Sequence, residues 1–401
     1  MTSNVPASVI ERLAESHPEM EVWFDSSPLI FKSWRDQVVA EAEPAKRDAL
    51  RVQLNRLYPF DAPATCLFRG VTTNPPLSLQ AIQRDPETWD KWVREEVKKH
   101  PDWDGKTMFW HTYREVVRCG AEMLKPIFEA SGYKNGYISG QVDPRILTDT
   151  DEMVRQGLEL NDANPNVMIK MPGTRQGIEG IERLTAMGIP TNATLTFATS
   201  QLFAVAEAVK SGLAKAKADG VDLTQWRSVV TMMLGRMEDH PVFKEQAEGL
   251  GIELSDADLR WAGLAIFKKT YKILRDPANG YSTKMLAASM RVGPKVDGQE
   301  KVWHLEKLTG GAIVLTVFPN IFEAFLKDYK PEEIKPLMDE PVPDDVIEKL
   351  SKIPYFRQAY DEDGLEPDEW IDFAPVVATG DSFSDATNEL EQWVTQRVEE
   401  K

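Results

Sequence analysis

Short apolar runs alternate along the chain with longer segments in which apolar residues recur every three or four positions. The short runs are typical of β-strands, and the longer segments, such as 177–187 and 200–218, are typical of helices that bury one face. Eight strands that alternate with helices predict an α/β fold, a (β/α)8 TIM barrel over about residues 1–330. We expect the strands at residues 21–25, 68–73, 136–142, 167–171, 190–197, 228–234, 284–290 and 312–317.

Two intervals are longer than a barrel crossover requires. The interval between the second and third strands contains four tryptophans among charged residues and amphipathic helix signals. We therefore expect a helical insertion at about 78–133. Residues 34–57, which precede the second strand, also have helical periodicity.

The C-terminal residues 331–401 hold 20 Asp and Glu against six Lys and Arg, so they carry −14 of the chain's formal net charge of −17. We expect an acidic extension that packs on the barrel, with short helices and loops over 332–367. A final helix is expected to begin at Ser384 as its N-cap. Its apolar stripe comprises Ala386, Leu390, Trp393, Val394 and Val398.

Charge and composition exclude several classes of protein. A strongly acidic chain is a poor nonspecific binder of nucleic acid, but the nearly neutral body leaves room for a positive pocket that takes an anionic substrate. No apolar run approaches the ~20 residues of a membrane span, and the first 20 residues lack the features of a secretion signal. Cys66 and Cys119 are the only cysteines, and the five histidines are scattered. We expect a cytoplasmic protein without a metal ion or cofactor. The sequence leaves open whether it forms a homo-oligomer.

One lysine stands at the carboxyl end of an apolar strand. Residues 166–174 read NVMIKMPGT, so Lys170 falls where a solvated cation is not normally placed. Apolar surroundings disfavour the charged amine, and a neutral amine can attack a carbonyl. From this run alone, Lys170 is either such a nucleophile or a lysine that reaches solvent or pairs with a carboxylate.

Polar residues also stand at the carboxyl ends of the other expected strands, where barrels of this kind build their active sites. The fifth strand presents three of them on one face, because alternate strand residues share a face. The candidates are Asp25, Asn74, Gln141, Asn192, Thr194, Thr196, Thr231, Met233, Arg236, Ser289 and Arg291.

Several segments between residues 20 and 325 are more specific than these single positions. They are GVTTNPPL, VDPR, VMIKMPGTRQGIEGIERLTAMGIPTNATLTF, the pair Gly235–Arg236, and AASMR. In order and approximate spacing they resemble the transaldolase family, which includes the fructose-6-phosphate aldolases. The resemblance favours the interpretation of Lys170 as a nucleophile.

The resemblance implies a metal-free class I mechanism. Lys170 would form a Schiff base with a ketose carbonyl, the C3–C4 bond would break, and a dihydroxyacetone unit would stay on the enzyme until an aldose phosphate accepted it. Asp25 would move the proton of the C4 hydroxyl, and Thr194 would position a catalytic water together with Gln141. The implied substrate-binding residues are Asn74, Asn192 and Thr231 for the sugar and Arg236, Ser289 and Arg291 for its phosphate.

Two positions depart from the family pattern. Gln141 stands where transaldolases have a glutamate, and an amide cannot exchange a proton at neutral pH. Met233 stands where the fructose-6-phosphate aldolases have tyrosine and transaldolases have phenylalanine. Proton transfer would then rest on Asp25 and bound water, or on a tyrosine or histidine from an insertion.

Three functions stay open at this point. The first is a transaldolase that acts on sugar phosphates. The second is an aldolase that releases dihydroxyacetone or acts on an unusual sugar, which Gln141 and Met233 favour. The third is a binding barrel without catalysis, although such a protein has no need of the Lys170 amine.

Overall fold

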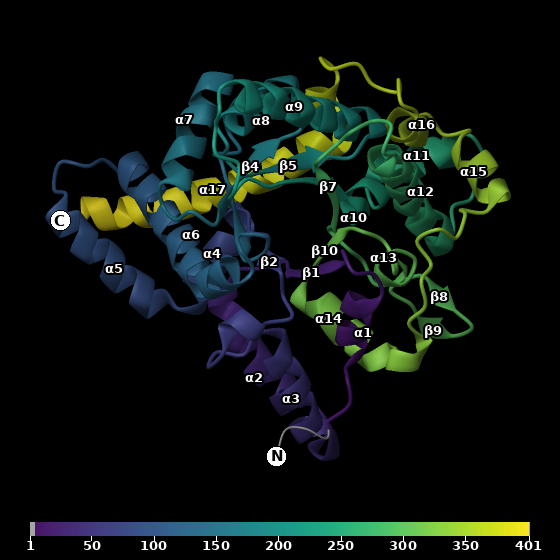
Figure 1. The fold of residues 1–401 in the computed structure, drawn as a ribbon, viewed down its shortest axis with the longest axis horizontal. Helices are drawn as coiled ribbons and strands as arrows, with labels where there is room; N and C mark the ends of the chain where they lie inside the picture. Colours follow the sequence, from purple (N-terminus) through teal and green to yellow (C-terminus); the bar gives the residue numbers. More distant parts are fainter. Residues whose placement is uncertain (1–4, 401) are drawn as a thin grey trace.

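The eight expected strands form a closed, parallel barrel in the computed structural model, which describes residues 5–400 (Figure 1). The order around the barrel is β1, β10, β7, β6, β5, β4, β3, β2, and pairing of β1 with β10 closes it. The (β/α)8 prediction is thus confirmed. The barrel strands are β1 Glu21–Phe24, β2 Gly70–Val71, β3 Tyr137–Gln141, β4 Val167–Pro172, β5 Thr191–Thr196, β6 Ser228–Met233, β7 Lys284–Ala288 and β10 Val314–Val317.

Strand ends differ from the expected ones where the backbone leaves the extended conformation. β7 ends at Ala288, because Ser289 has a φ of 57° in the left-handed region. Leu195 has a φ of 55°, and the pairing of β5 with β6 shifts between Ala193 and Thr196. This bulge interrupts the face that Thr196 was expected to share with Asn192 and Thr194. The Thr196 hydroxyl donates instead to the carbonyl oxygen of Thr231.

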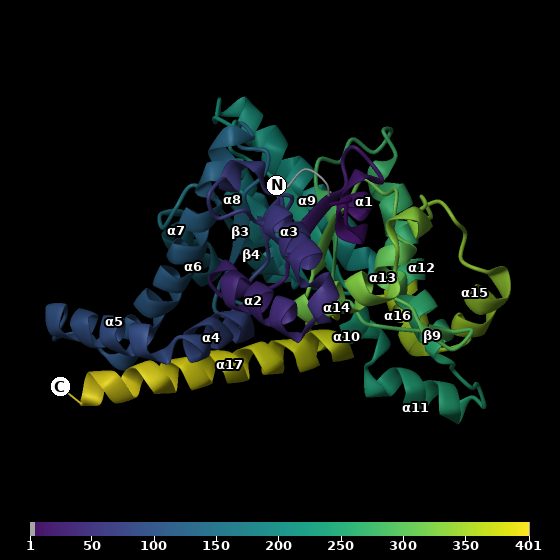
Figure 2. The same ribbon diagram turned by 90° about the horizontal axis from the view of Figure 1, so that it is seen from below.

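Helices surround the barrel, and one or more follow most of the strands (Figures 1 and 2). The expected helical stretch 34–57 is two helices, because a short turn that contains Pro44 separates them. No helix within residues 5–400 has the length and apolarity to cross a membrane. The helices outside the insertion and the C-terminal segment are α1 Val9–Glu15, α2 Phe31–Glu41, α3 Arg47–Leu57, α7 Thr150–Asn161, α8 Arg175–Ala186, α9 Thr199–Ala218, α10 Leu234–Glu238, α11 Pro241–Gly249, α12 Asp256–Arg275, α13 Trp303–Glu306 and α14 Pro319–Asp328.

Three helices occupy the long interval between β2 and β3. They are α4 Pro75–Arg84, α5 Pro86–Lys99 and α6 Gly105–Ala130, and each is capped by an acidic or amide side chain, from Asn74, Asp85 and Asp104 respectively. Between β7 and β10, the two short strands β8 Lys295–Val296 and β9 Gln299–Glu300 form a hairpin outside the barrel.

A plug of large side chains fills the amino-terminal end of the barrel interior. It comprises Trp23, Tyr137, Met168, Val229, Leu286 and Val314, all of them buried. Gly70 in β2 makes room for the Trp23 ring, since a Cβ at that position would lie 2.5 Å from the indole. The interior is therefore closed at this end, and a polar cavity can exist only toward the carboxyl ends of the strands.

The C-terminal segment includes α15 Asp344–Leu350, α16 Pro354–Tyr360 and the long helix α17 Ala374–Glu399. The prediction of Ser384 as the N-cap is wrong, because α17 begins ten residues earlier with Pro375 in its first turn. These first turns contain Gly380 and several β-branched residues, which have low helix propensity, so the sequence pattern did not predict them as helix. Leu390 and Val394 of the expected stripe are buried. Figure 2 shows α17 lying across one face of the molecule, where it contacts α4, α5, α6, α10 and β5.

Candidate active site

Lys170 lies at the carboxyl end of β4 with only 5% of its surface exposed. Its Nζ donates to the carbonyl oxygen of Thr73 at 3.0 Å. Burial lowers the pKa of Lys170 to about 8, the charge of Asp25 acts against this shift, and the charge of Arg236 adds to it. At pH 7 about one amine in ten would be neutral, roughly 300 times the fraction of an ordinary lysine. The structure thus makes Lys170 a buried amine that can lose its proton near neutral pH.

Asp25 follows β1 and lies close enough to Lys170 for each charge to act on the other. Burial raises the pKa of Asp25 to about 6, while the charge of Lys170 and a hydrogen bond from Thr72 act to lower it. The Thr72 hydroxyl donates to Asp25 Oδ1 at 2.8 Å, so the Thr316 hydroxyl must donate to Thr72. A chain of two hydroxyls from β10 and the β2 end therefore orients the carboxylate.

A cavity lies beside these two groups, with about 380 Å³ of empty space when its opening to solvent is included. It includes seven of the ten side chains to which the family resemblance assigns a catalytic or binding role, and the other three, Gln141, Asn192 and Arg291, do not line it. The lining residues are Asp25, Thr72, Asn74, Lys170, Thr194, Thr231, Met233, Arg236, Ala288, Ser289, Phe318 and Phe383.

Asn192 supports the cavity from within the barrel wall. It is fully buried on β5, where its Nδ2 donates to Ser139 Oγ at 2.9 Å and its Oδ1 accepts from the Thr231 hydroxyl at 2.7 Å. Asn74 has a second role, because its Oδ1 accepts the Leu77 N–H and caps α4. The Thr194 hydroxyl lies 3.9 Å from the sulfur of Met233. Of these residues, Asn74, Thr194 and Thr231 line the same cavity as Lys170.

One arginine, Arg236, lines the cavity, and a second, Arg291, is close enough for its charge to act on the first. Arg236, on α10, makes no hydrogen bond or ion pair within residues 5–400, and its guanidinium carbon lies 5.4 Å from the centre of the Phe383 ring. Burial and the charge of Arg291 lower the pKa of Arg236. Arg291 donates through Nε to Asp239 at 2.6 Å and through Nη1 to Ser289 Oγ at 3.2 Å. A half-buried cation without a counter-ion, next to a second arginine, is the chemistry of an anion site.

Gln141 lies beside Lys170 in the pairing of β3 with β4, and it lines a different, smaller cavity. That cavity is bounded by Phe109, Tyr113, Thr387 and other residues beneath α17. The Gln141 Oε1 is buried and has no hydrogen-bond partner within the described chain. Tyr113 of the insertion accepts the Gln141 N–H at 2.9 Å, and burial raises the pKa of this phenol. Tyr113 thus holds the Gln141 backbone but does not reach the Lys170 cavity.

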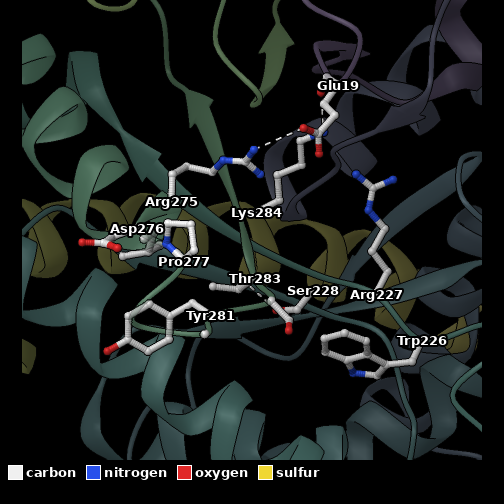
Figure 3. Close-up of a pocket in the computed structure, with 13 residues that line it drawn as sticks. Glu19, Trp226, Arg227, Ser228, Arg275, Asp276, Pro277, Tyr281, Thr283 and Lys284 are labelled. Atoms are coloured by element: carbon white, nitrogen blue, oxygen red, sulfur yellow. Dashed lines mark hydrogen bonds and ion pairs between the residues drawn. The ribbon is translucent and has the colours of Figure 1, made fainter.

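A larger hollow of about 790 Å³ lies at the opposite end of the barrel, around the first residues of β6 and β7 (Figure 3). Its cations are all paired: Arg275 with Glu19 at 3.2 Å, and Arg227 and Lys284 with Glu21 at 2.6 and 2.7 Å. These ion pairs satisfy the charges that a ligand would otherwise meet. The smaller cavity at the carboxyl ends is therefore the better candidate for a catalytic site.

Phe383 lines the cavity, but the sequence did not indicate it as a site residue. Of the lining residues it lies nearest to the C-terminus. It lies on α17, is 1% exposed, and lines the cavity with its ring beside Arg236. Thr72, Thr316 and Phe318 were also missed as site residues. Thr72 could have been found, because it belongs to the motif GVTTNPPL, whereas nothing in the local sequence links Phe383 to the strand ends.

A sequence model of the family described as Transaldolase/Fructose-6-phosphate aldolase matches residues 47–365, which include seven of the eight barrel strands. The chain belongs to this family. Among its relatives, a transaldolase of Thiobacillus denitrificans is 32% identical over 271 residues, which are 65% of this chain and 74% of the relative. Transaldolase 1 of Streptomyces avermitilis is 32% identical over 261 residues, 62% and 67% of the two chains. A transaldolase of Mycobacterium ulcerans is 34% identical over 171 residues, 42% and 45% of the two chains.

Membership in the transaldolase/fructose-6-phosphate aldolase family confirms the resemblance inferred from the sequence motifs. The matched residues include Lys170 and both arginines, but neither Asp25 nor Phe383. In this member of the family, the residues from Ala374 onward lie outside the match and still complete the wall of the cavity.

Replacing Phe383 with alanine is expected to raise KM for a phosphorylated donor about 2- to 30-fold, since a cation–π contact is worth roughly 0.5–2 kcal/mol and the cavity loses one of its lining rings. Steady-state kinetics would measure this. Val394→Ala is the matched control, because Val394 is buried on the same helix and does not line the cavity. An equal change in both variants would mean that α17 as a whole, rather than the ring, sets the affinity.

Proposed function

We propose that this protein is a class I transaldolase that moves a dihydroxyacetone unit from a ketose phosphate to an aldose phosphate. The observation that carries the proposal is a buried lysine with a pKa of about 8 in the same cavity as a carboxyl group with a pKa of about 6 and an unpaired arginine. These three groups supply a nucleophile, an acid–base catalyst and a phosphate ligand.

The first step follows from the state of the amine. Neutral Lys170 attacks the C2 carbonyl of the ketose, and the carbinolamine loses water to give a protonated imine. Asp25, with a pKa near the working pH, accepts and returns the protons of this exchange. Thr194, on the neighbouring strand β5, contributes a hydroxyl that can hold a water molecule.

Bond cleavage uses the same groups. Asp25 removes the proton of the C4 hydroxyl, the C3–C4 bond breaks, and its electrons pass to the iminium nitrogen as an enamine forms. The aldose phosphate leaves, and the enamine attacks the aldehyde carbon of an acceptor in the reverse sequence. Asn74, Asn192 and Thr231 supply amide and hydroxyl groups to hold the three-carbon unit, Asn192 acting partly through Thr231. We also propose a cytoplasmic setting, which the sparse cysteines favour.

The phosphate is assigned to Arg236, Ser289 and Arg291. Planar guanidinium groups donate two hydrogen bonds to a phosphate, and Arg236 has its donors available. Arg291 already donates to Asp239 and to Ser289, so Arg236 is the main source of uncompensated charge. Ser289 adds a hydroxyl to the lining at a backbone position with positive φ.

Arg236→Ala is expected to raise KM for fructose 6-phosphate about 10- to 150-fold, because hydrogen bonds to charged groups are worth about 1.5–3 kcal/mol. Arg291→Ala is expected to have a smaller effect, since part of its donor capacity is already used. The ratio of KM for phosphorylated and unphosphorylated donors measures the effect. Arg275→Ala, at the other end of the barrel, is the control and should leave this ratio unchanged. A larger effect of Arg291→Ala would reverse the assignment of the main charge.

The experiment that tests transfer is cleavage of fructose 6-phosphate with and without an acceptor aldehyde. A transaldolase retains the three-carbon unit, so turnover should depend strictly on the acceptor. Release of free dihydroxyacetone without acceptor would favour the aldolase alternative, which Gln141 and Met233 support. Absence of any covalent adduct after borohydride treatment with the ketose would reject both and leave a binding barrel.

A further inference from the structure

Four side chains behind the two arginines, those of His304, Glu238, Arg260 and Asp239, form a closed ring of hydrogen bonds and ion pairs with Arg291. The Arg291 backbone N–H donates to His304 Nδ1 at 3.0 Å, and His304 Nε2 lies 2.8 Å from Glu238 Oε1. Glu238 Oε2 pairs with Arg260 Nη1 at 2.9 Å. Arg260 Nη2 donates to Asp239 at 2.6 Å, and Asp239 accepts from Arg291 Nε at 2.6 Å. The ring therefore holds both the backbone and the side chain of one arginine.

The tautomer of His304 follows from its two partners. A backbone N–H can only donate, so Nδ1 of His304 must be the acceptor. The ring proton is then on Nε2 and points at the carboxylate of Glu238. Four of the five links in the ring are directional hydrogen bonds, and the link between Glu238 Oε2 and Arg260 Nη1 is an ion pair without hydrogen-bond geometry. His304 links Arg291 after β7 to Glu238 on α10.

Three members of the ring are buried and tightly packed, whereas the side chains of Arg291 and Asp239 are 34% and 41% exposed. The side chains of Glu238 and His304 are fully buried, and that of Arg260 is 7% exposed. A Cβ at Gly263 of α12 would lie 2.1 Å from Glu238 Oε1, and a Cβ at Gly235 would lie 2.7 Å from Arg291 Cζ. Two glycines therefore allow the neighbouring helices to approach the ring, and little room remains for its members to move.

Buried charges are costly, so an arrangement of this kind needs a physical reason. The guanidinium groups of Arg236 and Arg291 repel each other, as the effect of Arg291 on the pKa of Arg236 indicates. Before an anion binds, two such cations would move apart unless the backbone held them. Arg236 shares α10 with Glu238, and Asp239 follows directly, so the ring fixes the helix that carries one arginine to the loop that carries the other.

We propose that Glu238, Arg260 and His304 are positioning residues that hold Arg236 and Arg291 at the separation a phosphate group requires. None of the three lines the cavity, so they act through the arginines and touch no substrate. The inference rests on the proposed function for the identity of the ligand as a sugar phosphate. The geometry of the ring itself requires only that the site bind an anion.

Two substitutions and two measurements test this role. His304→Asn removes the link to Glu238, and Glu238→Gln keeps the shape of the side chain while it removes the charge that faces Arg260. The matched control is His111→Ala, a half-buried histidine on α6 that also contacts a glutamate, at 3.2 Å, and lies outside the ring. The first measurement is equilibrium binding of inorganic phosphate to the full chain. The second is KM and kcat for fructose 6-phosphate and for unphosphorylated fructose.

In both ring variants, phosphate affinity and the KM for fructose 6-phosphate should weaken at least about tenfold, with kcat for unphosphorylated fructose within twofold of wild type. Glu238→Gln is the more conservative change, and it tests the positioning role by itself if His304→Asn does not fold. Unchanged phosphate affinity in a folded variant, or equal losses with both donors, would overturn the proposal. So would an absence of phosphate binding to the wild-type protein. If instead the wild type binds phosphate but forms no imine, the positioning role stands and the proposed function fails.

Discussion

Lys170→Met is expected to abolish turnover, with kcat lower by at least about 10⁴-fold, as removal of a covalent nucleophile costs other enzymes. Methionine fills much of the volume of lysine without an amine, so the barrel should remain folded. Borohydride reduction in the presence of fructose 6-phosphate, followed by mass spectrometry, should show an adduct on the wild-type protein and none on the variant. An adduct that persists in the variant would place the nucleophile elsewhere.

Lys268 provides a matched control for this experiment. It is 5% exposed, as Lys170 is, and burial lowers its pKa to about 8 as well. Its Nζ, however, donates to the carbonyl oxygens of Leu337 and Glu340 outside the barrel. Lys268→Met should lower stability by about 1–3 kcal/mol, because two carbonyls lose their donor, and should leave the adduct on Lys170 intact. Comparison of Lys170→Met with Lys268→Met distinguishes the effect of a lowered pKa from the effect of access to a substrate cavity.

Asp25→Asn is expected to have two effects of opposite sign. Turnover should fall about 10²- to 10⁴-fold, because the general acid–base group is lost. Formation of the imine should shift to lower pH, because the charge of Asp25 raises the pKa of Lys170 toward its ordinary value and asparagine has no charge. Borohydride trapping as a function of pH measures the second effect independently of turnover.

The wild-type profile follows from the same two groups. Asp25 becomes a base as the pH rises through about 6, and Lys170 becomes a nucleophile as it rises toward about 8. Turnover should therefore increase across this interval. Asp143→Asn is the control, since Asp143 pairs with Arg145 at the end of β3 and does not line the cavity. The pH dependence of borohydride trapping in Asp143→Asn should match that of the wild type. If the curve of Asp25→Asn is not shifted, the charge of Asp25 does not act on the pKa of Lys170 and the prediction is wrong.

The strands could be predicted from sequence because a parallel barrel buries both faces of each strand, which leaves continuous apolar runs. Their ends could not, because the carboxyl ends carry conformations that propensity does not encode. Ser289 and Leu195 adopt positive φ although neither is glycine, and both stand beside the cavity. Strained backbone at such positions is where local rules fail and where function concentrates.

The candidate site was predictable where it lies on strands and less so where it depends on tertiary contacts. Lys170 and Thr194 follow from the period of a strand and the rule that barrels place their sites at the carboxyl ends. Gln141 is paired with Lys170 in the sheet, yet the cavity that it lines is the smaller one beside α17. Phe383 and the ring around Glu238 arise from segments far apart in sequence, so no local pattern contains them.

The position of helix α17 makes acceptor preference separable from catalysis, two properties that often change together. The amine, the carboxyl group and the arginines all stand on or shortly after barrel strands, while the lining residue Phe383 belongs to a helix that contributes no strand pairing. Exchange of this one helix would alter which acceptor aldehydes fit without disturbing the groups that make and break the carbon–carbon bond. For an engineer, residues near Phe383 are thus the first place to vary the products of this enzyme.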